Sequence, residues 1–182
     1  MPVDNFPTEA GLSWAVKASF QDYVAARPEG SIVPSGGARI EGRSFFFPLD
    51  AVEREDDGRI RKLQFQGSIT LSAHDGYLSV SIADPVICVE ENSARIWIRS
   101  PGAPTSATPS NYLLAEATPI TLHDNDGEWE RIEILEPLLS TNAVTLFDNV
   151  YPYRTPLEPL RARTPSMANS NPDRPVSRIR PA

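Results

Sequence analysis

Residues 60–82 read IRKLQFQGSITLSAHDGYLSVSI, and this stretch decides the class of fold. The apolar residues of its first half, from 63 to 73, all fall on odd positions, while Gln, Ser and Thr occupy even ones. Such alternation is typical of a strand with one buried face. Asp75-Gly76 is a strong tight-turn signal, and the alternation resumes over residues 78–82. The segment therefore predicts a long antiparallel hairpin.

The rest of the chain predicts one helix and a series of short strands. Pro28 ends the helix, because proline disfavours helical geometry in the residue before it. Pro48 marks the end of the first strand or a sheet edge. Between residues 8 and 26, apolar or aromatic side chains recur at helical spacing, at Leu12, Val16, Phe20, Tyr23 and Val24. Besides the hairpin, short strands are expected at residues 43–49, 86–89, 94–99, 112–116, 120–123 and 131–135.

Together these patterns predict an α+β fold that is mostly β, with the N-terminal helix packed on an antiparallel, multi-stranded sheet system. The length of 182 residues suits a single domain with its own core. Beyond about residue 156 the chain is rich in Pro and Arg and nearly lacks large apolar residues. We therefore expect a domain at residues 1–160 and a disordered tail at residues 161–182.

The composition narrows the choice of partners and compartments. The net charge of −7 argues against nucleic acid or an anionic membrane as the main partner. No apolar run approaches the ~18 residues of a membrane span. The N-terminal residues have neither the basic nor the apolar region of a secretory signal. The sequence predicts a cytoplasmic protein without membrane insertion, or a secreted or cell-surface one if an export signal has been removed.

The side chains that carry chemistry are few. Cys88 is the only cysteine, which excludes an internal disulfide, a thiolate zinc site and an iron–sulfur cluster. The Gly-x-Ser-x-Gly turn of many hydrolases and the phosphate-binding loops are absent, so we expect no enzyme. Taken alone, His74 is interpreted as an exposed histidine beside a turn, and Tyr23 as a core tyrosine on the apolar helix face.

Three segments together resemble the HtaA-type haem-binding domain, which occurs in surface haem-uptake proteins of Gram-positive actinobacteria. Residues 11–24, GLSWAVKASFQDYV, are similar to the opening helix of that family. Residues 65–85, FQGSITLSAHDGYLSVSIADP, are similar to its central hairpin. Residues 143–159, which include Tyr151, are similar to its closing segment. The resemblance spans most of residues 11–159 in order.

The resemblance implies a set of site residues. In the family, the tyrosine of the opening helix coordinates haem iron, and the histidine before the hairpin turn supports it. Here these residues are Tyr23 and His74. A tyrosine of the closing segment also contributes to haem binding, and its counterpart is Tyr151. Three further residues complete the expected site: Ser19, one helical turn before the first tyrosine, and the two apolar walls Phe20 and Phe147.

The chemistry that the resemblance implies is coherent. Ferric iron favours an anionic oxygen ligand, and tyrosinate ligation of haem occurs in catalase. Tyrosine alone is neutral at pH 7, but a bound metal favours the phenolate. A histidine nitrogen about 2.6–3.2 Å away would orient that oxygen by a hydrogen bond. The resemblance thus implies a protein that binds ferric haem b through Tyr23 and stores, buffers or transfers it in iron acquisition.

Two other hypotheses remain open. One is a haem-free structural or partner-binding β module that keeps the fold. The other is a haem-degrading oxygenase, which would be recognised by turnover of haem with an electron donor. Around Tyr151 the chain departs from the family pattern, with Val150 where an aromatic residue is expected. The expected partners are haem itself and either another haem-carrying protein or a second copy of the chain in a homodimer.

Overall fold

The computed structural model describes residues 6–103, 109–123 and 127–167. Its helices are α1 (Ala18–Ala25) and two 3₁₀ helices, η1 (His74–Gly76) and η2 (Asn142–Phe147). Its strands are β1 (Gly11–Trp14), β2 (Ser31–Ser35), β3 (Arg39–Glu41), β4 (Ser44–Arg54), β5 (Ile60–Phe65), β6 (Ser68–Ala73), β7 (Leu78–Ala83), β8 (Val86–Glu90), β9 (Ser93–Ile98), β10 (Tyr112–Ala117), β11 (Thr121–His123), β12 (Trp129–Ile134), β13 (Leu138–Leu139) and β14 (Leu160–Pro165).

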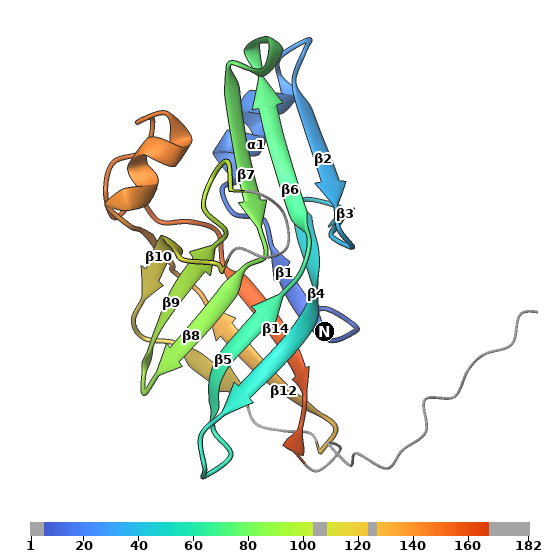
Figure 1. The fold of residues 1–182 in the computed structure, drawn as a ribbon, viewed down its shortest axis with the longest axis vertical. Helices are drawn as coiled ribbons and strands as arrows, with labels where there is room; N and C mark the ends of the chain where they lie inside the picture. The colour runs from blue at the N-terminus through green and yellow to red at the C-terminus, as the bar shows by residue number, and fades with distance from the viewer. Residues whose placement is uncertain (1–5, 104–108, 124–126, 168–182) are drawn as a thin grey trace, which may run out of the picture.

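Within the described ranges the strands form two antiparallel sheets (Figure 1). The large sheet has the order β11-β12-β14-β1-β4-β5-β8-β9-β10-β13, and β3 pairs with β4 beside it. The small sheet has the order β2-β6-β7 and extends beyond the large one, with α1 packed on β2 and β6. The expected α+β fold, one N-terminal helix on an antiparallel sheet system, is confirmed.

The hairpin of residues 60–82 is confirmed at its tip and divided at its base. β6 and β7 pair along their whole length, with Ala73 opposite Leu78 next to η1. The expected single strand before the turn is two strands in different sheets, β5 and β6. The chain leaves one sheet for the other at Gly67, whose φ of +99° is a conformation that favours glycine. The Gly67 N–H donates to the Asp84 carboxylate at 2.9 Å, which fixes the crossing.

The helix expected at residues 8–26 is wrong in its first half. The strand β1 occupies part of that stretch and pairs with β4 on one side and β14 on the other. Leu12 and Trp14 are fully buried, so their spacing of two reflects a central strand. The helix begins only at Ala18, after Val16 has turned the chain with a φ of 61°.

The strand expected to end at Pro48 is also longer than predicted. β4 continues through this proline to Arg54. Pro48 lies opposite Gly11 of β1, and a register shift between Leu49 and Ala51 follows as the strand goes on to pair with β5. β4 thus has a neighbouring strand on each side, β1 and β5, and Pro48 is not at the edge of the sheet.

The domain boundary expected at residue 160 falls inside the large sheet. β14 starts at this residue and pairs with both β1 and β12. Its alternate side chains Leu160, Ala162 and Thr164 are buried. The sheet therefore includes the first part of the expected tail, and residues 168–182 lie outside the described residues.

One connected hydrophobic core joins the two sheets and α1. Trp14 of β1, Phe45 and Phe47 of β4, and Phe147 of η2 are among its largest fully buried side chains. The core therefore reaches from the centre of the large sheet to α1, which carries Tyr23, and to η2, which precedes Tyr151 in the chain. In the part of the chain that the structure describes, no helix has the length and apolar character that crossing a lipid bilayer requires.

Candidate functional site

α1 carries two hydroxyl groups on its exposed side. Ser19 and Tyr23 are four positions apart, which places both side chains on one side of the helix. The buried side carries Phe20, Gln21 and Val24 instead. The sequence alone suggested that Tyr23 lies on the buried apolar face of the helix. It does not, and the residue is 37% exposed. Each of the two hydroxyls meets a side chain from a different, distant segment of the chain.

Tyr23 and His74 form the expected pair at the hairpin tip. Tyr23 Oη and His74 Nε2 are 2.5 Å apart, within hydrogen-bonding distance, and the two rings are tilted by 53°. His74 and Asp75 have φ values of 53° and 54°, a left-handed conformation that is uncommon outside glycine. The side chain of His74 is 46% exposed, so solvent reaches both partners of the pair.

Glu29 contacts the same histidine from its other nitrogen. Its carboxylate accepts the backbone N–H of His74 at 3.0 Å and lies 3.8 Å from Nδ1. Hydrogen bonds from its own backbone N–H and from that of His74 hold the pKa of Glu29 below its ordinary value. An ionised carboxylate thus fastens the hairpin tip to the segment after α1. The sequence did not reveal this contact, which joins residues forty-five positions apart.

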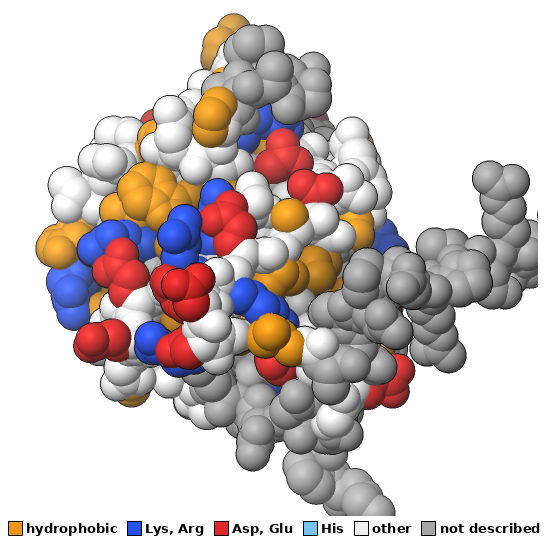
Figure 2. All heavy atoms as spheres, turned by 60° about the horizontal axis from the view of Figure 1, so that its bottom comes forward, with side chains coloured by type: hydrophobic (Ala, Val, Ile, Leu, Met, Phe, Trp, Pro, Cys, Tyr) orange, Lys and Arg blue, Asp and Glu red, His pale blue; other side chains and the backbone are white. Residues whose placement is uncertain are grey.

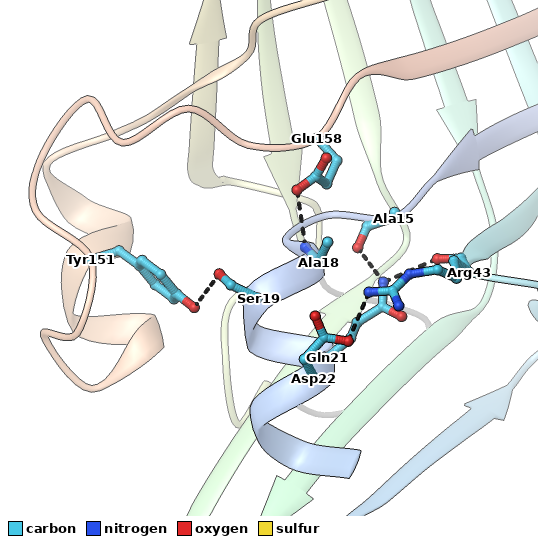
Figure 3. A network of polar contacts seen from close by, with 8 residues as sticks. All are labelled: Ala15, Ala18, Ser19, Gln21, Asp22, Arg43, Tyr151 and Glu158. Carbon is cyan, nitrogen blue, oxygen red and sulfur yellow. Dashed lines mark hydrogen bonds and ion pairs between the residues drawn. The ribbon is translucent and has the colours of Figure 1, made fainter. Parts of the chain in front are cut away.

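The second hydroxyl of α1 meets the closing segment. Ser19 Oγ and Tyr151 Oη are 2.9 Å apart (Figure 3). The Tyr151 ring packs edge-on against Phe147 and Phe20, with centroids 5.7 and 6.5 Å away. Both phenylalanines are buried, so they support Tyr151 from the core. Their expected role as walls against a porphyrin stays a prediction.

Glu158 fixes the closing segment to the start of the helix (Figure 3). Its Oε1 accepts the N–H of Ala18 at 3.1 Å, one of the donors that a helix N-terminus leaves without a partner. Its backbone carbonyl accepts the indole N–H of Trp14 at 2.8 Å, and its N–H donates to the Val16 carbonyl at 2.9 Å. These bonds join β1, α1 and the closing segment, so the Ser19–Tyr151 contact has a rigid base.

Two cations lie over the rings of the site. The Arg27 guanidinium is 4.5 Å from the centroid of the Tyr23 ring, and the Lys17 ammonium is 5.5 Å from that of Tyr151. The sequence did not indicate either contact, because both depend on how the chain turns at the two ends of α1. The site therefore combines hydroxyl groups, aromatic rings, one imidazole and positive charge.

A broad hollow lies elsewhere on the molecule. It has a volume of about 950 Å³ on the face of β5, β8 and β9, and its lining does not include Tyr23, His74 or Tyr151. The basic side chains in it are paired with carboxylates, as in Lys62–Glu53. Residues 6–103, 109–123 and 127–167 contain no group of three or more His, Cys, Asp or Glu side chains placed to hold a metal ion. The expected residues instead come together on the surface around α1, through the Tyr23–His74 and Ser19–Tyr151 contacts, and we take this surface as the candidate site.

Comparison with known proteins yields one family and several similar structures. The C-terminal domain of HtaA from Corynebacterium glutamicum has a TM-score of 0.72 and 22% identity, covering 86% of this chain and 95% of that one. The haem-binding protein HtaB from the same organism has a TM-score of 0.62 and 18% identity, covering 84% and 90%. A domain-swapped dimer of a histidine-to-alanine variant of the HtaA C-terminal domain has values of 0.63 and 20%, covering 91% and 99%.

These identities are low, and the structural likeness shows a common fold. No curated protein matches the chain. The family model described as Htaa, however, matches residues 9–163, from just before β1 into β14. The match includes α1, the β6–β7 hairpin and the closing segment, and with them every residue of the expected site. The chain belongs to the HtaA family.

Proposed function

We propose that this protein binds ferric haem and that the phenolate oxygen of Tyr23 is the iron ligand. The observation that carries the proposal is the 2.5 Å contact between Tyr23 Oη and His74 Nε2 at a solvent-accessible position beside α1. A hydroxyl deep in a packed core would leave no room for a macrocycle, whereas this one lies at the surface. The family match and the haem-binding relative HtaB support the proposal.

The donor set around Tyr23 suits a ferric porphyrin. Bound haem supplies a hard, positively charged iron that favours an anionic oxygen donor. His74 donates a hydrogen bond from Nε2 to the phenolate oxygen and thereby orients it. Glu29 holds the backbone of His74, so the imidazole stays opposite Tyr23. On this proposal the helix provides the ligand and the hairpin tip provides its hydrogen-bond partner.

The closing segment forms the second side of the proposed site. Ser19 holds the Tyr151 hydroxyl, and Phe147 and Phe20 hold its ring, so the side chain has little freedom. A fixed aromatic ring at a surface suits contact with a planar macrocycle. We therefore assign porphyrin contact to Tyr151, with Ser19, Phe20 and Phe147 as its support.

The biological role that follows is haem storage, buffering or transfer in iron acquisition, with haem b as the ligand and no catalytic reaction. A second haem-carrying protein or a second copy of this chain would be the partner in transfer. A domain-swapped dimer is known for a histidine-to-alanine variant of the related HtaA domain, which is consistent with a second copy as the partner.

The proposal is tested by titrating ferric haem into the native protein and two variants. The native protein should give a Soret band and a charge-transfer band typical of tyrosinate. Tyr23→Phe keeps the ring and removes the ligand oxygen, so the tyrosinate band should disappear. His74→Gln should shift or weaken the band, because the phenolate loses the imidazole as hydrogen-bond donor. The matched control is Tyr77→Phe, which alters a tyrosine that is 95% exposed at the same hairpin tip.

Two outcomes would contradict the proposal in different ways. An unchanged spectrum in Tyr23→Phe would defeat the assignment of the iron ligand. No spectral change when haem is added to the native protein would defeat haem binding altogether. It would favour the alternative, a partner-binding β module that keeps the family fold.

A further inference from the structure

Most basic side chains of the described residues have a carboxylate partner. At the end of the molecule away from α1, basic and acidic side chains lie next to one another (Figure 2). Ion pairs with carboxylates of the described ranges are formed by Arg39, Arg43, Arg54, Arg59, Arg61, Lys62, Arg95, Arg99 and Arg161. Such pairs satisfy each cation locally and leave it little to offer an external anion.

Three other cations follow a different pattern. Lys17, Arg27 and Arg154 form no ion pair with any of the described residues, and each lies over a tyrosine ring. Two of those rings are Tyr23 and Tyr151, and the third belongs to the neighbouring Tyr153, 6.0 Å from the Arg154 guanidinium. In a chain with a net charge of −7, Lys17 and Arg27 thus contact the two tyrosines of the proposed haem site, and Arg154 lies in the same closing segment as Tyr151.

The surroundings of the three side chains leave their charge available. Arg27 and Arg154 are exposed, and Lys17 is half-buried with its ammonium donating to the Pro156 carbonyl at 2.9 Å. A neutral carbonyl or an aromatic face does not neutralise a cation. Arg27 has an acidic neighbour in Glu29, but that carboxylate is bonded to the backbone N–H of His74. Positive charge thus flanks the site at both ends of α1.

We propose that Lys17, Arg27 and Arg154 make the site selective for planar macrocycles that carry carboxylates. The inference rests on the proposed function and names the part of the ligand that is recognised besides the iron. Haem b carries two propionates, and ionised carboxylates are attracted by Arg and Lys. Because this attraction acts on the edge substituents, it does not depend on the metal in the ring. The cations therefore discriminate a dicarboxylate porphyrin from its neutral ester.

The test compares ferric protoporphyrin IX with its dimethyl ester in absorbance titrations. The native protein should bind the diacid about tenfold more tightly than the ester, because the ester lacks the charges that the cations attract. This factor corresponds to about 1.4 kcal/mol of binding free energy. The variant Lys17→Gln/Arg27→Gln/Arg154→Gln should lose most of this preference. The control Arg59→Gln/Arg61→Gln/Arg95→Gln removes the same amount of positive charge from ion-paired side chains outside the site. This control should keep the preference for the diacid.

Two further measurements keep the outcome independent of the iron and of the variants. The binding of metal-free protoporphyrin IX, followed by its fluorescence, should weaken in the site variant by the same factor as the binding of the ferric diacid. In the native protein, raising the salt from about 0.05 to about 0.5 M should weaken the binding of the metal-free diacid and leave that of its uncharged, metal-free dimethyl ester unchanged. This comparison needs no substitution, so it decides the question even if the triple variant fails to fold.

The result that would overturn the inference is a diacid preference that persists in the site variant, or an equal response of diacid and ester to salt. Neither result would touch the iron ligand. If Tyr23→Phe still abolishes the tyrosinate band, the proposed function stands and only the selectivity fails. If the native protein binds no porphyrin, both fail together.

Discussion

Glu29 connects two parts of the site that the sequence keeps far apart. Its carboxylate accepts a hydrogen bond from the backbone N–H of His74. This residue has a left-handed backbone conformation, which is unfavourable for residues other than glycine. An ionised acceptor at that N–H stabilises the turn in the conformation that places the imidazole beside Tyr23. The same bonds lower the pKa of Glu29 from its ordinary value of 4.5.

Glu29→Gln should therefore weaken the hairpin tip at neutral pH and not at low pH. Since the folded-state pKa is lowered, the stabilisation is fully present above the ordinary pKa of 4.5 and is lost as the pH falls through the lowered folded value. The difference in unfolding free energy between native protein and variant should be largest at pH 7 and shrink as the pH falls below 4.5. Urea denaturation of both proteins across this range measures it. A pH-independent difference would show that the charge of Glu29 contributes nothing.

The individual site residues were predictable only in part. Tyr23 and His74 follow from the resemblance of the helix and hairpin segments to one family, because composition and spacing alone give each an ordinary structural role. Glu29, Arg27 and Lys17 were not predictable. Their contacts depend on where the turn after α1 and the hairpin tip meet in space, and no periodicity of the sequence encodes that distance.

Among the elements, the crossing from β5 to β6 at Gly67 sets the position of the hairpin. A Cβ at this position would lie 2.6 Å from the Ala38 nitrogen, and its φ of +99° disfavours any other residue. Gly67→Ala should destabilise the protein by about 2–4 kcal/mol, since it combines a left-handed strain with a backbone clash. Urea denaturation with a fixed m-value measures the loss.

Gly76, at the hairpin tip, supplies the matched control. Its φ is +89°, but a Cβ there would have nothing within 4 Å. Gly76→Ala should therefore cost only the conformational part, about 1 kcal/mol. Equal losses in the two variants would mean that the close approach of Ala38 does not constrain the crossing.

The β6–β7 hairpin was predicted correctly because its alternation is clear, whereas β1 and β2 were missed because theirs is ambiguous or absent. Leu12 fits the period of a strand together with Trp14, and it also fits the period of a helix together with Val16 and Phe20. The conflict is resolved by pairing with β4 and β14, which only the folded chain reveals. Strand β2 contains a proline and four exposed residues, so its sequence carries no buried face to detect.

At the level of the whole molecule, β14 completes the large sheet between β1 and β12. A chain that ends at residue 167 should unfold at the same temperature as the full chain, because every described strand is kept. A chain that ends at residue 159 should fail to fold cooperatively, since two central strands lose a shared neighbour. Circular dichroism during heating distinguishes the two. Cooperative melting of the shorter chain would place the true boundary at 160.

The sequence suggested a tail in this region because arginine and proline dominate its composition. The alternation was nevertheless present, since Leu160, Ala162 and Thr164 face inward and the intervening residues are arginines. Arginine stems can lie along a sheet while their charged ends stay near water. Arg161 shows how this works, because its Nε forms an ion pair with the carboxylate of Glu133 on the adjacent β12, 2.5 Å away.

The pairing of β1 with β14 also decides how the domain responds to tension. Gly11 lies opposite Arg163 at one end of the pair, and Trp14 lies opposite Leu160 at the other. β1 thus begins beside the end of β14, and a force that pulls these two strand ends apart loads the Gly11–Arg163 pair first. Hydrogen bonds between antiparallel strands lie perpendicular to the strands, so this force acts along the bonds. They would break one after another from the loaded end and not all at once. Pulling these strand ends apart would therefore open the large sheet at modest force and soon reach Trp14, shortly before α1 in the chain.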